Sequence, residues 1–146
     1  MKIIVADSLP ASALSALATE GWTVDARSGR PVKELAADIA DADAILVRSA
    51  TKVDATLIAA APKLRIIARA GVGVDNVDVE AASARGILVV NAAGASSISV
   101  AEHAWALILA LSRAVPVADR AMKAGKWDKD RKSTRLNSSH GYISYA

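Results

Sequence analysis

The sequence predicts an α/β fold built on a flavodoxin-like, doubly wound parallel sheet, and three observations support this. Short apolar runs alternate with segments of helical periodicity about every 20 residues along the chain. Of the 146 residues, 53% are apolar and only 3% aromatic, a composition that suits helices packed on buried parallel strands. Right-handed crossovers then leave few doubly wound strand orders, and the five-stranded flavodoxin-like order is the natural one.

Each expected strand is an apolar run bounded by polar or turn-forming residues, and each expected helix repeats apolar residues three or four positions apart. The strands are Lys2–Ala6, Trp22–Val24, Ala44–Val47, Leu64–Ala70 and Ile87–Val90. The helical sets between them are Leu9, Ala13, Leu14, Leu17 and Ala18; Val32, Leu35, Ala36 and Ile39; Leu57, Ile58 and Ala61; and Val77–Ala84. Gly21, Pro62 and Gly86 are the expected helix stops.

A longer apolar helix is expected over Ser99–Arg113. Ser97 or Ser99 would cap it, and Glu102 would lie in its first turn, where a carboxylate interacts favourably with the helix dipole. Apolar residues occur on nearly all of its sides, so we expect it to pack against more than its own domain.

Composition and charge exclude several classes of function. The chain has no Cys, which excludes disulfides, thiolate metal sites and cysteine nucleophiles, and no other metal-ligand pattern is present. Residues 1–129 carry 15 basic against 14 acidic side chains, so no basic surface for nucleic acid is expected. The first apolar run is too short for a signal peptide and no run spans a bilayer, so a soluble, cytoplasmic protein without membrane contact is expected.

Residues 130–146 differ in composition from the rest of the chain and show no periodicity of 2 or 3.6. The composition by itself fits a disordered extension. The run DRKSTRLNSSH, followed two residues later by ISYA, resembles a translated sequencing adapter. We therefore interpret 130–146 as a non-native tail, and no functional argument rests on it.

Three loops lie at the carboxyl ends of expected strands, the edge at which open α/β sheets bind ligands: Arg48–Lys52, Gly71–Asn76 and Asn91–Ser97. The first two carry candidate site residues. In the first, Arg48–Lys52, the Arg48 guanidinium suits a carboxylate or a phosphate, and Ser49 adds a hydroxyl. The alternative is a solvated loop without a ligand. Spacing alone leaves both interpretations open.

In the second loop, Arg69 ends an apolar strand and needs an anionic partner to offset its desolvation. That partner is either a ligand or one of two carboxylates, Asp75 and Asp78. Gly71 and Gly73 would let backbone N–H groups approach an anion closely. The turn lacks the third glycine of a dinucleotide fingerprint, because position 76 is Asn.

His103 and Glu102 are adjacent on the expected long helix, so they point about 100° apart and form no acid–base pair. We interpret His103 as a packing residue.

Four segments read together resemble the D-isomer-specific 2-hydroxyacid dehydrogenases. They are RSATKV (Arg48–Val53), ARAGVGVDNVD (Ala68–Asp78), GILVVN (Gly86–Asn91) and ISVAEH (Ile98–His103). The resemblance implies a substrate-binding domain over 1–97. It assigns 98–129 to a crossing helix and the start of a truncated Rossmann NAD-binding domain, and it implies a homo-oligomer formed through the crossing-helix region.

The resemblance also implies site residues. Arg48, Ser49, Arg69, Gly71, Val72 and Gly73 would bind a small anionic substrate, 3-phosphoglycerate, and Val72 and Gly73 would also meet the cofactor NAD. The reaction would be oxidation of 3-phospho-D-glycerate to 3-phosphooxypyruvate, the first step of serine biosynthesis. The family's catalytic arginine, glutamate and histidine would lie beyond residue 129, so no catalytic residue is assigned and the chain alone is expected to be inactive.

The alternative is a free-standing flavodoxin-like anion-binding or signalling domain without enzymatic activity. A phosphorylated receiver domain would need several acids after its first strand and an aspartate ending its third. Here Asp7 stands alone and the third strand is followed by Arg48. The dehydrogenase interpretation is therefore preferred.

Overall fold

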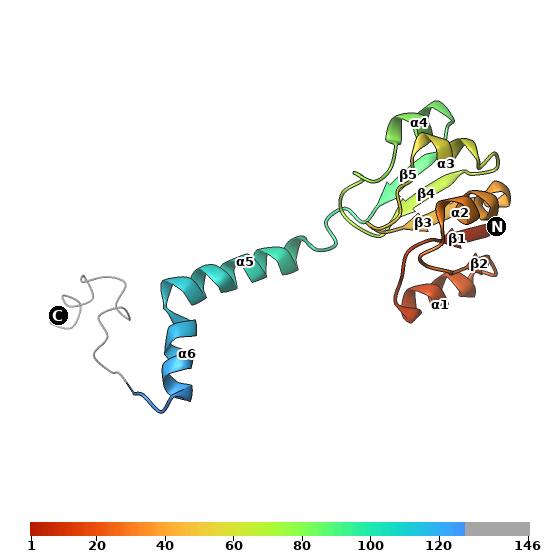
Figure 1. Ribbon diagram of the computed structural model, residues 1–146. Helices are drawn as coiled ribbons and strands as arrows, with labels where there is room; N and C mark the ends of the chain where they lie inside the picture. Colours follow the sequence, from red (N-terminus) through yellow and green to blue (C-terminus); the bar gives the residue numbers. More distant parts are fainter. Residues whose placement is uncertain (128–146) are drawn as a thin grey trace. The chain divides into compact units, whose positions relative to one another are not determined.

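The computed structural model describes residues 1–127, so the predicted tail lies outside the described residues. The chain divides into two compact units, one over Met1–Ala95 and one from Ser96 onward (Figure 1). The assignment of 1–97 to a substrate-binding domain and 98–129 to a cofactor domain remains a prediction.

The first unit is a five-stranded parallel sheet. Its strands are β1 (Lys2–Val5), β2 (Thr23–Asp25), β3 (Ala44–Val47), β4 (Ile66–Arg69) and β5 (Leu88–Asn91). They lie in the order β2-β1-β3-β4-β5, and every neighbouring pair is parallel, which confirms the predicted flavodoxin-like sheet. The main differences from the expected bounds are a shorter β4 and one-residue shifts of β2 and β5.

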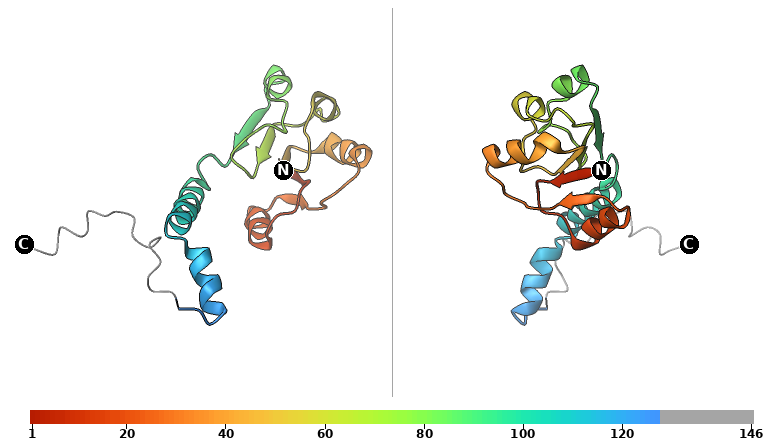
Figure 2. Two further views of the ribbon diagram at one scale, coloured as in Figure 1. Left: turned by 60° about the vertical axis from the view of Figure 1, so that its left-hand side comes forward. Right: turned by 90° about the vertical axis from the view of Figure 1, so that its right-hand side faces the viewer.

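Helices cover both faces of the sheet, because successive strand side chains point to opposite sides. On one face Ile3 and Val5 pack with apolar residues of α1 (Ala11–Thr19). On the other face Ile4 and Ile45 pack with residues from three helices (Figures 1 and 2). These helices are α2 (Val32–Asp38), which continues as a 3₁₀ turn over Ile39–Asp41, α3 (Ala55–Ala59) and α4 (Val79–Ala84).

The α1 face is only partly covered. Leu88 and Val90 of β5 lie in register with Ile66 and Ala68 of β4, and they are 58% and 41% exposed. A doubly wound sheet of this order commonly carries a further helix after the fifth strand. Here the helix that follows β5 belongs to the second unit.

The second unit contains α5 (Ser97–Ser112) and α6 (Val115–Lys123). The predicted long helix is present but begins two residues earlier than expected. Two details of the prediction are wrong. Neither expected serine caps it, because the N-cap is Ser96 and makes no side-chain capping bond, and Glu102 lies beyond the first turn.

No residue of α5 is buried within the described part of the chain, and Trp105 and Leu111 are 63% and 82% exposed. Over residues 1–127 no single helix meets the length and hydropathy needed to cross a bilayer. The α5–α6 pair meets them only when taken together, with a 64° bend between the two helices.

Candidate functional site

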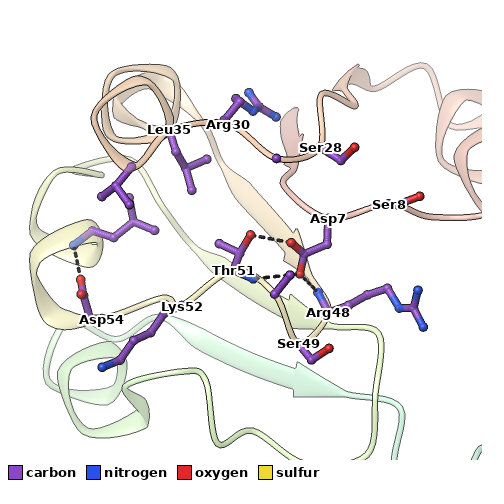
Figure 3. Close-up of a pocket in the computed structure, with 14 residues that line it drawn as sticks. Asp7, Ser8, Ser28, Arg30, Leu35, Arg48, Ser49, Thr51, Lys52 and Asp54 are labelled. Atoms are coloured by element: carbon purple, nitrogen blue, oxygen red, sulfur yellow. Dashed lines mark hydrogen bonds between the residues drawn. The ribbon is translucent and has the colours of Figure 1, made fainter.

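The loop that follows β3 is organised around Asp7, a buried carboxylate at the end of β1. Its Oδ2 accepts hydrogen bonds from the backbone N–H groups of Arg48 (2.6 Å) and Thr51 (3.2 Å). Its Oδ1 accepts a bond from the Thr51 hydroxyl at 2.6 Å (Figure 3). Three donors from one loop therefore converge on one carboxylate.

These bonds explain the acidity of Asp7. Burial raises the pKa of its carboxyl, but the hydrogen bonds from the Thr51 hydroxyl and from backbone N–H groups of the loop outweigh burial. The pKa of Asp7 is therefore held below its ordinary value, and the carboxylate is ionised at neutral pH.

Asn76 binds carbonyl groups of the same loop. Its Nδ2 donates to the carbonyl oxygens of Arg48 (2.7 Å) and Thr51 (2.6 Å). A short parallel bridge between Val53 and Val77 joins the two loops next to this contact. The loops after β3 and β4 are thus tied together through both side-chain and backbone bonds.

Arg48 and Ser49 are exposed at the rim of a pocket of about 720 Å³. The lining also includes Ser8 after β1, Ser28 and Arg30 after β2, and Thr51 and Lys52. The pocket opens at the carboxyl ends of β1 and β3, the point where strand order reverses and open α/β sheets bind ligands. Figure 3 shows the side chains of Arg48 and Lys52 extending in opposite directions, so the two cations flank the pocket and do not converge.

The guanidinium of Arg48 forms no hydrogen bond or ion pair with any of residues 1–127. Its backbone is held by Asp7 and Asn76 while its side chain remains available. This arrangement suits recognition of an anion that comes from outside the protein.

Arg69 is arranged differently. Its side chain is only 11% exposed and folds back over the turn after β4. Nη1 donates to the carbonyl oxygen of Gly73 at 2.5 Å, Nε donates to that of Arg48 at 3.3 Å, and Nη2 lies 3.4 Å from Asp75 Oδ1. Of the two carboxylates considered from the sequence, Asp75 is the partner, whereas Asp78 caps α4 by accepting from Ala81 N.

The glycines of this turn make room for the Arg69 guanidinium. A Cβ at Gly71 would lie 3.2 Å from Arg69 Nη1, and one at Gly73 would lie 3.2 Å from the same atom and 2.9 Å from Asp75 Oδ1. Between them Val72 is 49% exposed, and its carbonyl accepts a bond from Asn91 Nδ2 at 2.5 Å. The sequence predicts that these glycines let backbone N–H groups approach an anion, which stays a prediction; in the structure they make space for the Arg69 guanidinium.

A cluster of ion pairs stabilises the opposite wall of the pocket. Arg30, whose side chain is 3% exposed, pairs with Asp25 (3.1 Å) and Asp38 (2.9 Å) and donates to the carbonyl oxygen of Val5. Hydrogen bonding from Arg27, opposed by burial, together with the charges of Arg27 and Arg30, lowers the pKa of Asp25 to about 2. These bonds fix the chain between β2 and α2 where it lines the pocket.

Not all predicted site residues meet at the pocket. Arg48 and Ser49 line it, whereas Arg69 and Gly71–Gly73 lie beside it at the end of the neighbouring strand. Sequence reasoning did not identify Asp7 or Asn76 as organising residues. A carboxylate directly after a fully apolar strand was the available signal for Asp7, and Asn76 carried none.

His103 is exposed on α5, so the packing role expected for it is not seen within residues 1–127. The same described residues contain no cluster of His, Cys, Asp or Glu that could hold a metal ion.

The first unit is an α/β domain with a parallel sheet of the doubly wound order and arginines at the carboxyl ends of two adjacent strands, the edge at which open α/β sheets bind ligands. A family model described as the catalytic domain of D-isomer specific 2-hydroxyacid dehydrogenases matches residues 3–139. The chain belongs to this family, as the sequence resemblance implied. The match extends ten residues into the segment interpreted as a non-native tail.

Among curated relatives, the chain is 49% identical to D-3-phosphoglycerate dehydrogenase of Archaeoglobus fulgidus over 131 residues, covering 90% of this chain and 25% of that protein. Among solved structures, it is similar to 2-hydroxyacid dehydrogenase from Ketogulonicigenium vulgare Y25, with a TM-score of 0.75, 31% identity and coverage of 86% and 40%. It is also similar to NAD⁺-bound 3-phosphoglycerate dehydrogenase of Entamoeba histolytica, with a TM-score of 0.66, 32% identity and coverage of 77% and 39%. The chain therefore spans about a quarter of the length of the curated relatives it matches.

Proposed function

We propose that this chain is the substrate-binding part of an NAD-dependent oxidoreductase that oxidises 3-phospho-D-glycerate to 3-phosphooxypyruvate, the first step of serine biosynthesis. The observation that carries the proposal is the pair Arg48 and Arg69 at the ends of adjacent strands, with the Arg48 guanidinium free of any partner among residues 1–127. The names of the relatives support this substrate, and the family favours an enzyme over the alternative of a signalling domain.

In this proposal Arg48, Ser49 and Arg69 bind the carboxylate and phosphate of the substrate. Two cations on adjacent strands suit a ligand with two anionic ends. Asp7 accepts hydrogen bonds from the Arg48–Thr51 loop, and Asp75 forms an ion pair with Arg69. The arginines, Ser49 and the glycine turn bind and orient the substrate, and no residue of the described chain is assigned the proton transfer.

The Val72–Gly73 turn fits the nicotinamide end of NAD. Val72 is half exposed and Gly73 is also exposed, so the turn faces solvent beside Arg69. When bound, the cofactor accepts the hydride that leaves C2 of the substrate. Val72 and Gly73 would line the cofactor site, and Arg69 would bind the substrate beside them.

We extend the proposal to a homo-oligomer formed through α5, whose exposed residues include Val100, Trp105 and Leu109. An exposed apolar surface of this kind favours association. Sedimentation velocity of the chain should show dimers or larger species. A well-behaved monomer at every concentration would count against this part of the proposal.

Binding by the chain itself tests the substrate assignment. Calorimetry should detect 3-phosphoglycerate and show at least about tenfold weaker binding of D-glycerate, because the phosphate forms charge-assisted bonds of about 1.5–3 kcal/mol. Equal affinities for the two ligands would remove the phosphate from the proposal. Absence of binding by either ligand would overturn the assignment of this sheet edge as a substrate site.

A further inference from the structure

The Arg48–Thr51 loop has no regular secondary structure, and residues 48–50 are exposed, yet its backbone is held on two sides by residues distant in sequence. Asp7, 41 positions before Arg48, accepts from the loop's N–H groups. Asn76, 28 positions after it, donates to the loop's carbonyl groups. The loop therefore obtains from two side chains the backbone bonds that a helix or strand would supply.

We propose that Asp7 and Asn76 are positioning residues that fix the backbone of Arg48 so that its guanidinium is held ready for the substrate anion. The inference rests on the proposed function, because it gives Arg48 a ligand. It adds two residues that act on the ligand through the backbone of Arg48.

The two residues have opposite and non-interchangeable tasks. An ionised carboxylate only accepts hydrogen bonds, and at Asp7 it meets two N–H groups and one hydroxyl. At Asn76 the two nearby carbonyl oxygens only accept, so they require the NH₂ of the amide. Asn76 Oδ1 is buried and accepts no bond from residues 1–127, so the donations to the loop are the bonds that offset burial of the amide.

The arrangement favours ligand binding over simple folding. The larger apolar core lies between the sheet and helices α2, α3 and α4, around Ile4, Ile45 and Ile67. It does not include residues 48–51 of the loop. The bonds to the Arg48 backbone leave its side chain without a partner in the described residues. A loop that served only stability would gain more from a paired arginine. A loop ordered before binding spares the ligand the entropic cost of ordering it.

A double-mutant cycle on the 146-residue chain tests the inference, with 3-phosphoglycerate affinity measured by calorimetry. Asp7→Ala should weaken binding about tenfold, and Asn76→Ala by a similar factor, because the loop must then be ordered on binding. In an Arg48→Ala background Asp7→Ala should have almost no further effect, because both changes act through the same guanidinium. An equal loss with and without Arg48 would overturn the inference.

Conservative variants keep the test valid if Asp7→Ala does not fold. Asp7→Asn retains an acceptor for the N–H groups and can donate to the Thr51 hydroxyl, so it should bind within about threefold of the wild type. Thr51→Val removes one of the three donors and should fall between Asp7→Asn and Asp7→Ala. Asn76→Asp places a carboxylate against two carbonyl oxygens and should weaken binding more than Asn76→Ala.

Asp43→Ala is the matched control. Asp43 also accepts a backbone N–H from a distant residue, Lys2 N at 2.7 Å, but it precedes β3 and so lies at the amino end of the strands. Its loss should lower stability and leave the affinity unchanged. If Asp43→Ala weakens binding as much as Asp7→Ala, the effect is one of general stability and the inference fails.

Amide exchange separates failure of this inference from failure of the proposed function. Asp7→Ala should speed exchange at the N–H groups of Arg48 and Thr51 relative to those of β3. If the wild type binds no 3-phosphoglycerate, the proposed function fails, while selective exchange in the loop would still support the positioning role. Unchanged exchange in the loop would overturn the positioning role whether or not the ligand binds.

Discussion

Arg48 and Arg69 lie at the carboxyl ends of neighbouring strands, but the fold holds them in opposite ways. The backbone of Arg48 is held by Asp7 and Asn76, and its side chain has no partner in residues 1–127. The side chain of Arg69 is bonded to Gly73 and lies beside Asp75. The Arg48 guanidinium is thus available to an external anion, whereas an anion that binds Arg69 would replace the Asp75 carboxylate.

This difference has an energetic consequence. An anion that binds Arg48 gains a charge-assisted bond without breaking one, apart from bonds to water. An anion that binds Arg69 competes with Asp75, although that carboxylate is 81% exposed and its ion pair is correspondingly weak. We therefore expect Arg48 to contribute more to affinity and Arg69 more to the shape of the turn.

Removing Arg48 should have the largest effect on binding. Arg48→Ala should weaken 3-phosphoglycerate affinity about 10- to 100-fold, corresponding to about 1.5–3 kcal/mol for bonds to a charged group. Its free energy of unfolding should stay within about 0.5 kcal/mol of the wild type, because the side chain is exposed. Calorimetry and urea unfolding measure the two quantities.

Lys52→Ala is the control for this change. Lys52 carries the same charge and lines the same pocket, but its side chain extends away from that of Arg48 (Figure 3). It should alter affinity less than about threefold. Comparable losses from both variants would indicate a diffuse electrostatic effect, and the distinction drawn for Arg48 would be lost.

Crowding the Arg69 turn should have an intermediate effect. A Cβ added by Gly73→Ala would lie 2.9 Å from Asp75 Oδ1 and 3.2 Å from Arg69 Nη1, so at least one of these side chains must move. We expect about tenfold weaker binding together with about 1 kcal/mol lower stability, because the turn must rearrange. Unchanged affinity would show that the position of Arg69 does not matter for the ligand.

Gly21→Ala is a control for glycine substitution in general. A Cβ there has open space, although its φ of +69° makes the change strained, and Gly21 does not line the pocket. It should cost stability without changing affinity.

The two arginines also show which features of the fold and the site the sequence could predict. Apolar runs and helical periodicity predicted the parallel sheet and its order, because burial on both faces constrains strand composition strongly. The same patterns placed Arg48 and Arg69 at one edge of the sheet. They did not show whether either arginine was already paired, because that depends on side-chain directions in loops without periodicity.

Asp7 illustrates the missing information most clearly. It follows an apolar strand, and the sequence pattern around it indicates only an incomplete receiver motif. Its role depends on backbone N–H groups 41 and 44 positions away, and these leave no trace in residue type. The predicted cap of α5 was wrong for a related reason. Three nearby serines could each cap the helix, and the local sequence did not distinguish them.

Acid should loosen the Arg48 loop, because Asp7 holds it as a carboxylate. The pKa of Asp7 lies below its ordinary value, so the folded state binds fewer protons there than the unfolded state. The stabilisation is complete above the unfolded pKa, about 4, and is lost as the pH falls through the lower folded pKa. Asp25, with a pKa of about 2, contributes in the same direction between about pH 4 and pH 2.

Urea unfolding of wild type and Asp7→Asn from pH 7 to pH 3 measures this contribution. The stability difference, of the order of 1 kcal/mol at pH 7, should shrink as the pH falls below about 4. Exchange at Arg48 N–H should accelerate over the same range. A difference that is constant with pH would show that the charge of Asp7 does not stabilise the loop.

Removing the carboxylate that competes for Arg69 should have the smallest effect, and in the opposite direction. Asp75→Asn keeps the shape of the side chain and abolishes its charge. An incoming anion then no longer has to displace the Asp75 carboxylate, whose Oδ1 lies 3.4 Å from Arg69 Nη2. Because exposed pairs contribute only about 0.2–1 kcal/mol, affinity for 3-phosphoglycerate should rise by about two- to threefold. The gain should disappear in an Arg69→Ala background, since no cation then remains for the carboxylate to mask. A gain of the same size in that background would assign the effect to net charge, and Arg69 would then be a structural residue of the turn with no contact to the ligand.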